Sequence, residues 1–484
     1  MNLRFQLHSL AVPVLAGILA AFSNAACRAQ SLSSLLELAR SSEPTYLGAR
    51  TNVEAAKART DQAFGALLPQ ISASANTNIN DRSYQTRIES MPTTDDRYNS
   101  NSTQFTLTQP LWRYANIVGL QQAEAAALQA GHQLAGTEQD LSSRLVAAWF
   151  DVLAARDNVS FTVQQAAATR KQWDIARRGL ELGASGLPQA EDARAKYDQA
   201  RAEAMSAETE AQIKLAGLEQ LVGTLKEFNA PRMLDDAVLA DLSGDQLDKW
   251  LQALETGNPA IQAALQAFQA ADAEVRKQLA GHQPTLDLVG TYGKNSQAVG
   301  GFPLQPGYDI KQGTIGLQLN IPIFSGGTQS AKVNEAVANR EKVRLDIEAA
   351  RRAATLAAKQ AWFGWKAAYA RAQAGQQAVK AAQAALQAAR LGRDTGLKME
   401  LDVLQAEQQL LAGERDLHKG HYDQLAAHVK LKAAAGLVTA EDLAALDKLF
   451  VASDGKAREP APAGPGPADP SPDLRARATL VPAK

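Results

Sequence analysis

Residues 315–327 read IGLQLNIPIFSGG, and this stretch decides what kind of fold the chain can adopt. Isoleucine or leucine occupies every second position from Ile315 to Ile323, with polar residues, glycine or proline between them. Such alternation is typical of a β-strand with one apolar and one polar face. Gly326 and Gly327 then precede a long stretch without proline. A strand with one apolar face that runs into a very long helix is rare in soluble sheets, so another setting is indicated.

Composition narrows the classes of protein to which the chain can belong. It has 484 residues and a formal net charge of −1, so no basic field marks a nucleic-acid partner. Residues 1–29 combine Arg4, a short apolar run and small residues, which predicts a secretory signal peptide cleaved after Ala29. Cys27, the single cysteine, is lost with this segment, unless it is the acylated first residue of a lipoprotein. No later stretch is apolar for long enough to form a transmembrane helix.

The sequence contains an internal repeat of more than 200 residues. The triplet Ala148-Trp149-Phe150 recurs 213 residues later at Ala361-Trp362-Phe363, and further glycine and proline anchors recur in the same order at similar offsets. We therefore predict a tandem duplication. Its expected parts are repeat 1 at 30–246, repeat 2 at 247–451, and a disordered Pro/Ala-rich tail at 452–484.

Each repeat should contain a helix, two strands and then long helices. The long helical stretches, about 116–182 and 328–395, would each extend about 100 Å if unbroken. Their apolar residues are spaced as in a coiled coil, with alanine allowing close helix approach: Leu134, Leu141, Leu145, Ala148 and Val152 in copy one, and Ile347, Ala354, Ala358, Ala361 and Trp365 in copy two. An alanine-rich soluble bundle would explain these helices equally well, but it leaves the strands unexplained.

The expected strands lie at about 70–84, 103–111, 285–293 and 313–324. Strands of about ten residues with one apolar face are the signature of a transmembrane β-barrel, and aromatic residues near their ends suit an interfacial girdle. The girdle candidates are Tyr84, Trp112, Tyr114 and Phe324. Four strands cannot close a barrel, and an open edge in lipid leaves backbone groups unpaired, so several chains must share one barrel. The strands alone do not choose between two and three chains.

The chain resembles the TolC family of outer-membrane channel proteins. The resemblance rests on LLPQISASA (67–75), VAAWFDVLAARDN (146–158), GHQPTLDL (281–288), IGLQLNIPIFSGG (315–327) and GLKMELDVLQAE (396–407), within a match over about 31–450. It implies a mainly α fold with a small β part and a homotrimer. Four strands per protomer would form a twelve-stranded barrel in the outer membrane, and the long helices would form a coiled-coil tunnel in the periplasm. Its partners would be outer-membrane lipid, a periplasmic adaptor protein, and an inner-membrane RND or ABC transporter that opens the passive exit duct.

The resemblance also implies a gate where each pair of long helices turns. Asp402 stands where the family has a pore-facing aspartate, and Lys398 stands where a reference member has arginine. Three further candidates depart from the family's residue types: Gln405, Arg393 and Gln189. Asp192, next to Glu191, is an alternative partner for Lys398. The expected swivel between barrel and tunnel comprises Pro110, Pro322, Gly326 and Gly327, because glycine tolerates unusual dihedrals.

Other chemistry finds no support in the sequence. His418, His421 and His428 lie on one expected helix, but no carboxylate at metal spacing completes a site, so they are expected to be solvated. No phosphate-binding loop or nucleophile motif appears, and we expect neither a cofactor nor an enzyme. The rival reading is a secreted or periplasmic coiled-coil scaffold without a channel.

Overall fold

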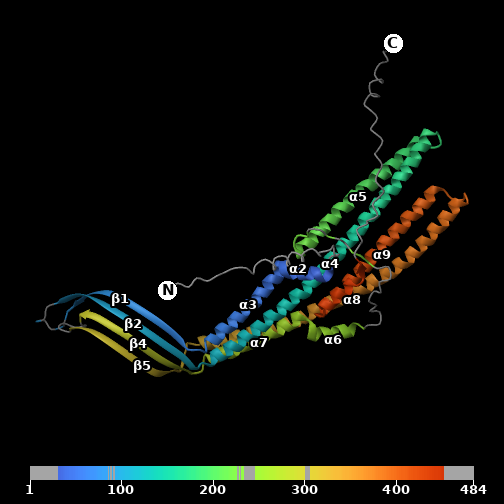
Figure 1. Ribbon diagram of the computed structural model, residues 1–484. Helices are drawn as coiled ribbons and strands as arrows, with labels where there is room; N and C mark the ends of the chain where they lie inside the picture. Colours follow the sequence, from blue (N-terminus) through green and yellow to red (C-terminus); the bar gives the residue numbers. More distant parts are fainter. Residues whose placement is uncertain are drawn as a thin grey trace, which may run out of the picture.

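The computed structural model describes residues 31–451, apart from gaps at 86, 88–89, 91–92, 226–227, 229–230, 234–245 and 300–305. The predicted signal peptide with Cys27 and the predicted tail at 452–484 lie outside the described residues. The described chain is mainly helical, with a four-stranded sheet at one end and two long helical hairpins at the other (Figure 1). This arrangement confirms the predicted fold class of long helices with a small β part.

The elements follow the same order in both halves of the chain. The first half contains α2 (Leu32–Ser42), α3 (Pro44–Gly65), β1 (Gln70–Tyr84), β2 (Thr94–Trp112), α4 (Tyr114–Glu181) and α5 (Leu187–Val222). The second half contains α6 (Leu247–Gly257), α7 (Pro259–Ala280), β4 (Thr285–Val299), β5 (Pro306–Asn320), α8 (Thr328–Asp394) and α9 (Glu400–Ala435). This is the order that a tandem duplication predicts. A short ladder of β3 (Arg232–Met233) and β6 (Phe450–Val451), with α10 (Ala440–Asp447), completes the described chain.

Several strand boundaries differ from the sequence prediction. β4 extends to Val299 rather than 293, and β5 begins at Pro306 rather than 313, because the polar outer halves of these strands pair with each other. β2 begins at Thr94 rather than 103, because its polar outer half pairs with β1 residue by residue although it shows no apolar alternation. β5 ends at Asn320, so the prediction that this strand continues to Phe324 was wrong. Pro322 has no N–H to donate to a ladder, which favours an end of the strand before it. No helix in the described part of the chain is long and apolar enough to cross a bilayer.

The sheet has strand order β1-β2-β4-β5, and every neighbouring pair is antiparallel. Residues directly opposite each other in such a pair share a face. Leu317 lies opposite Leu288, and Leu319 lies opposite Leu286, so the apolar row of the opening stretch continues onto β4. It reaches β2 and β1 through Leu107, which is paired with Ile71. The sheet therefore has one continuous apolar face and one polar face.

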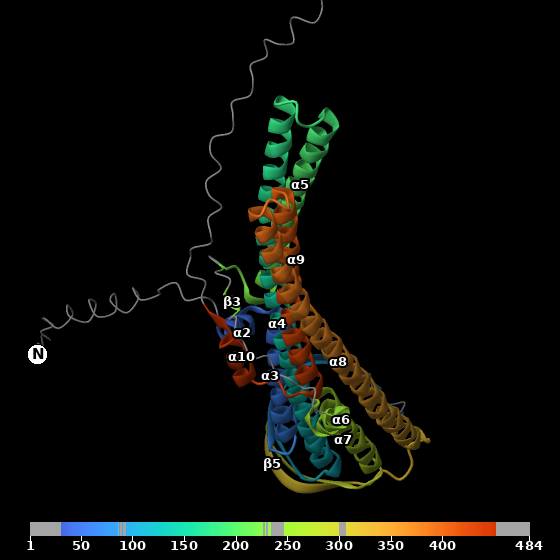
Figure 2. The ribbon, with the colours of Figure 1, turned by 90° about the vertical axis from the view of Figure 1, so that its right-hand side faces the viewer.

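The main hydrophobic core lies where the helices cross, midway between the sheet and the hairpin tips. Trp149 of α4 packs on Phe150 and Phe450, and Tyr422 of α9 stacks on Phe150. α2 packs against α4, α5 and α10 beside this core (Figure 2). The coiled-coil residues predicted from the sequence are buried along α4 and α8, except Leu134 and Ala148, which are partly buried. Toward the tips α8 and α9 approach closely, because Gly420 lies against Ala372 and Gly375 against Leu417.

Matching side chains cap the helices that start with proline in the two halves. Glu43, N-cap of α3, accepts a hydrogen bond from the Tyr46 amide at 2.6 Å, and Asn258 caps α7 in the same way. Burial raises the pKa of Glu43, but hydrogen bonds from Tyr46 and Thr45 and the Arg144 charge outweigh it, so the net pKa is lowered. Ionised Glu43 therefore stabilises the fold above the ordinary glutamate pKa.

Replacing Glu43 separates capping from titration. Glu43→Asn should keep the cap, whereas Glu43→Ala should cost about 1 kcal/mol at pH 7. Since the folded pKa is depressed, the wild-type contribution is lost as pH falls below about 4.3 through the folded pKa, and Glu43→Asn should lose less stability there. Thermal unfolding followed by circular dichroism across this pH range measures both effects. Identical pH profiles for wild type and Glu43→Asn would contradict the assignment.

Candidate pore wall and gate

The polar face of the sheet forms a wall of uncharged side chains. Its middle rows consist mainly of hydroxyl and amide groups, with Val289 and Ile310 as apolar members: Ser72, Ser74, Asn76, Asn78, Ser102, Gln104, Thr106, Thr291, Asn295, Gln312 and Thr314. Neighbouring strands also bond through these groups, as between Asn80 Nδ2 and Ser100 Oγ at 2.9 Å. Among the described residues of the sheet, charges on this face occur at its two ends, where Arg82 pairs with Asp96 and Arg113 pairs with Asp287. Water or a polar solute can therefore pass this wall without meeting an unpaired charge.

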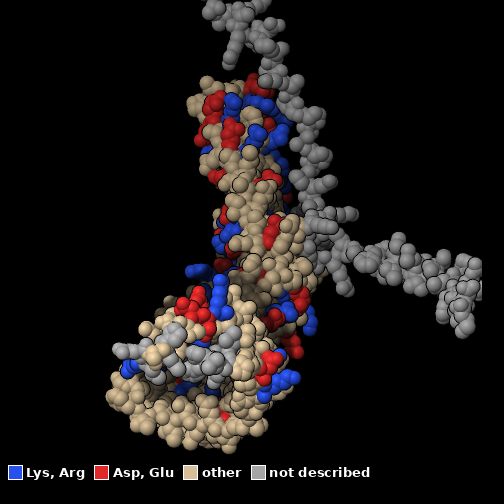
Figure 3. Space-filling view, turned by 90° about the vertical axis from the view of Figure 1, so that its left-hand side faces the viewer, with Lys and Arg blue, Asp and Glu red and all other residues tan. Residues whose placement is uncertain are grey.

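The girdle candidates do not all lie on the apolar face. Trp112 lies there, because the register places it opposite Leu286, and its ring stacks on Tyr114 at 6.4 Å between centroids. Tyr84 shares the polar face with Arg82, so the structure does not support it as a lipid-facing residue. Phe324 lies beyond the end of β5 with 88% of its surface exposed. Figure 3 shows the sheet end largely free of charged residues on its outer surface.

The two connections from sheet to helix are built differently. In the first half a single residue, Arg113, separates β2 from α4, and the ladder has a register shift between Pro110 and Trp112. Arg113 donates two hydrogen bonds to Asp287 on β4, from Nε at 2.8 Å and from Nη2 at 2.6 Å. This connection is clamped.

The second connection runs over residues 321–327 and contains Pro322. Gly326 and Gly327 have φ values of 60° and 79°, which favour glycine, and nothing surrounds the place where a side chain would stand. A swivel at this connection is thus compatible with the backbone. The same role for Pro110 is less compatible, because Pro110 lies within β2, opposite the Asp287 to which Arg113 donates its hydrogen bonds.

The gate candidates lie where each hairpin turns, and Asp402 and Gln189 cap helices there. The Asp402 carboxylate accepts a hydrogen bond from the Met399 amide at 2.9 Å, at the start of α9. Gln189 does the same for the Gly186 amide at 3.1 Å, at the start of α5. Both residues are the third of their helix, from which the side chain reaches back to the N-cap amide, as in one half of a capping box. Capping alone is a sufficient reason for an acid or amide at these positions.

The charged candidates pair within their own hairpins. Arg393 contacts Asp394 at 2.9 Å and Glu400 at 3.3 Å, and these hydrogen bonds raise its pKa. Asp192 pairs with Lys196 at 2.7 Å. Among the described residues no carboxylate lies within 4.0 Å of the Lys398 ammonium, whose stem lies against Gly392. The expected pairing of Lys398 with Asp192 is therefore absent within one copy.

Grooves between the two hairpins bring several of these residues together. One groove of about 380 Å³ joins Gln189 and Asp192 of α5 to Met399 and Glu400 at the start of α9. A second, of about 290 Å³, joins Gln405 to Lys196 and to amide side chains of α4 and α5. The gate candidates thus converge on the same end of the molecule. Within the described part of the chain, the hydrogen bonds and ion pairs of these candidates all stay within one hairpin.

The amino-acid sequence matches the family model described as outer membrane efflux protein over residues 35–224 and 250–437. The chain belongs to the outer membrane efflux protein family. It is 26% identical to the outer membrane protein TolC of Vibrio cholerae over 86% of this chain and 92% of the relative. It is also 26% identical to the alkaline protease secretion protein AprF of Pseudomonas aeruginosa, over 87% of each chain.

Solved channel structures share the fold. The Campylobacter jejuni CmeC outer membrane channel superposes with a TM-score of 0.70 at 17% identity, over 86% of this chain and 89% of that one. The outer membrane protein VceC of Vibrio cholerae gives a TM-score of 0.66 at 20% identity, over 84% and 97%. The predicted resemblance to TolC-like channels is confirmed at the level of family and fold.

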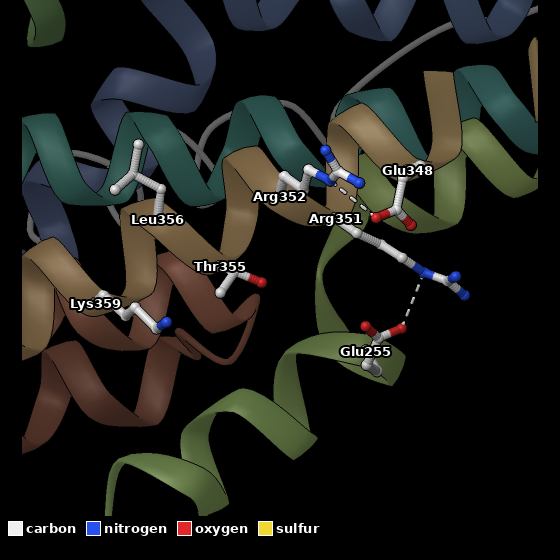
Figure 4. Close-up of a pocket in the computed structure, with 7 residues that line it drawn as sticks. All are labelled: Glu255, Glu348, Arg351, Arg352, Thr355, Leu356 and Lys359. Carbon is white, nitrogen blue, oxygen red and sulfur yellow. Dashed lines mark hydrogen bonds and ion pairs between the residues drawn. The ribbon is translucent and has the colours of Figure 1, made fainter. Parts of the chain in front are cut away.

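Outside the hairpins, a groove of about 510 Å³ lies where α6 meets α8 (Figure 4). Arg351 of α8 contacts Glu255 of α6 at 3.2 Å, and Arg352 contacts Glu348 at 2.9 Å. The Arg351–Glu255 ion pair links α6 to α8. Among the three histidines, His418 contacts Asp157 at 3.3 Å, and His421 is half-buried with its pKa lowered by burial and by His418. The expectation that these histidines are all solvated was wrong. No group of three metal-binding side chains occurs among the described residues.

The Arg113–Asp287 pair was not singled out from the sequence, because 174 residues separate its members. The sequence offered one signal for this pair. Asp287 places a charge between Leu286 and Leu288 in a strand whose other polar-face residues are mostly uncharged. The pair holds β4 against the start of α4.

Breaking this pair should weaken the fold measurably. Arg113→Ala leaves the Asp287 side chain, only 8% exposed, without its two donors, and should cost about 1.5–3 kcal/mol of stability. Asp192→Asn removes an exposed pair, with side chains 62% and 64% exposed, and should change stability by about 0.5 kcal/mol or less. Thermal unfolding of the purified variants makes the comparison. Equal effects of the two changes would refute a clamp at Arg113.

Proposed function

We propose that this protein is the outer-membrane exit duct of an efflux pump or type I secretion system. The observation that supports it best is the two-faced sheet, whose outer strands β1 and β5 each have one strand neighbour in the described chain. At membrane depth an unpaired strand edge costs several kcal/mol per backbone group, so these edges must pair with other copies. Three copies give a barrel of twelve strands, with the apolar face toward lipid and the amide-lined face toward the lumen.

The helical hairpins extend the duct away from the membrane. Residues of the two hairpin tips converge around the grooves at Gln189 and Gln405, and this supports a narrow entrance at that end. A periplasmic adaptor and an inner-membrane RND or ABC transporter open the entrance, and passage itself uses no energy. Relatives such as the protease secretion proteins PrtF and AprF support an export role by their names. The proposed export function requires no catalytic step.

Fractionation and bilayer recording test the duct against the scaffold alternative. The duct should require detergent for extraction, migrate as a trimer and conduct ions in a planar bilayer. Release by osmotic shock without conductance would favour the periplasmic scaffold.

Within the duct, Asp402 from three copies forms a ring of carboxylates at the entrance, which concentrates the electric field there. The ring and the capping role are compatible, because a carboxylate that accepts one amide hydrogen bond keeps its charge. Lys398 finds its partner, on this proposal, in a neighbouring copy rather than in its own hairpin. Arg393 and Gln405 border the same entrance.

Two substitutions distinguish charge from capping at Asp402. Asp402→Asn keeps an oxygen for the Met399 amide but removes the charge, so it should weaken block of the conductance by multivalent cations without loss of stability. Asp402→Ala should weaken the block equally and also cost about 1 kcal/mol through the lost cap. Single-channel recording and thermal unfolding give the two readouts.

Asp442→Asn is the matched control, since Asp442 accepts from the Thr439 amide at 3.0 Å in the capping box of α10, away from the tips. It should leave the cation block unchanged. If Asp402→Asn blocks like wild type, Asp402 has only the capping role.

A further inference from the structure

Rows of residues that lie opposite one another on neighbouring strands change in character toward the outer end of the apolar face. Moving away from the helices, Leu317 lies opposite Leu288 and Ile315 opposite Gly290. In the next row Tyr292 lies opposite Gly313 on one side and Phe105 on the other. A Cβ placed on Gly313 would lie 3.5 Å from the Tyr292 ring, so the ring extends across the glycine. This aromatic row is followed at once by lysine.

Lys294 and Lys311 form that next row, directly opposite each other on β4 and β5. Both side chains are exposed on the face that carries the leucines. Like charges directly opposite in an antiparallel pair destabilise a sheet, since their Cβ atoms are about 5 Å apart. Asp309 contacts the Lys294 ammonium at 3.4 Å and offsets one of the two charges. A net positive charge therefore remains on the outer surface of the sheet.

The depth of this row matches a lipid headgroup. Trp112, opposite Leu286, marks the inner end of the apolar face, and Lys294 lies eight residues along β4 from that row. Eight residues extend about 27 Å along a strand, and about 20 Å across the membrane at a tilt near 40°. The apolar band of a membrane barrel is about 25 Å tall, with aromatic residues at its borders. The backbone of the lysine row thus lies about 5 Å inside the outer border of such a band, with Tyr292 and Phe105 one row deeper. A lysine stem can extend along apolar surface over this distance and place its ammonium at the border.

We infer that Lys294 and Lys311 bind the phosphate of an anionic lipid headgroup in the outer leaflet. A phosphate between the two ammonium groups would replace their mutual repulsion by two charge-assisted hydrogen bonds. The aromatic row beneath would contact the start of the acyl chains. The inference rests on the proposed function, because it requires the apolar face to meet lipid. Each copy in the trimer carries one such site.

Retention of lipid by the purified trimer tests the site. The full-length protein is reconstituted in vesicles of equal phosphatidylglycerol and phosphatidylcholine, extracted, and the lipids that remain bound are counted by native mass spectrometry. Wild type should retain phosphatidylglycerol several-fold over phosphatidylcholine. The double variant Lys294→Gln/Lys311→Gln should bring this ratio close to one. Lys380→Gln, which removes an exposed lysine on α8, is the matched control and should leave the ratio unchanged.

A single variant guards against misfolding of the double variant. Lys311→Gln removes the repulsion, so it should raise the thermal stability in pure phosphatidylcholine vesicles while lowering the phosphatidylglycerol ratio. An excess of inorganic phosphate should not displace the bound lipid, since the site includes the aromatic row; displacement would assign it to free phosphate instead.

A wild-type ratio near one, or a ratio that the lysine substitutions leave unchanged, would overturn the lipid site. Conductance recorded on the same preparations separates the two proposals. Conducting trimers without a lipid preference would refute the site alone, whereas protein that neither inserts nor conducts would refute the duct and with it the site.

Discussion

The constraint on which the structure depends is that every backbone N–H and C=O at membrane depth needs a partner. The sheet meets this requirement at its three ladders and leaves it unmet along the outer edges of β1 and β5. One copy is therefore incomplete by construction, and the edges that would make a soluble protein aggregate become the surfaces on which copies join. In the proposed duct, the separation of apolar and polar side chains has the same origin, because each strand would meet lipid on one side and water on the other.

Charge is distributed in a way that fits this setting. On the sheet, the Arg82–Asp96 and Arg113–Asp287 pairs close the two ends of the polar face, and amides and hydroxyls fill the length between them. On the helices, many charged residues pair with a neighbour one turn away, as Asp192 does with Lys196. Such exposed pairs contribute little stability, about 0.5 kcal/mol or less, but they keep long helices soluble. The lysine row at Lys294 and Lys311 differs, because its charges face each other.

The fold could be predicted from the sequence because its signals are local. Alternation from Ile315 to Leu319 indicates a two-faced strand, and the absence of proline after Gly327 permits one very long helix. The outer half of β2 could not be predicted in this way, because Thr94 to Ser102 is polar on both faces and becomes a strand only through its neighbours. The ends of the strands could not be predicted either, because they depend on whether a neighbouring strand supplies hydrogen-bond partners. The residues around Pro322 do not indicate where that neighbour ends.

The site was less accessible to sequence reasoning for a physical reason. Asp402 and Gln189 occupy positions where a helix needs a cap, and the same residue types suit a pore ring, so residue identity cannot separate the two roles. Ion pairs between residues far apart in the sequence, such as Arg113 and Asp287, are equally hard to predict from the sequence. The distinction between Lys398 and Arg393 appeared only in three dimensions, where Arg393 contacts Glu400 and Lys398 lies along Gly392.

The unlike connections at Arg113 and at Gly326–Gly327 have a mechanical consequence for an assembled ring. Stiff and compliant joints would alternate around its circumference, because each copy contributes one of each kind. Torque applied to the tunnel would be transmitted to the sheet mainly through α4, while α8 could rotate about its glycines with little disturbance of β5. Such a ring can change the bore of its distal end and still keep the membrane-embedded part round.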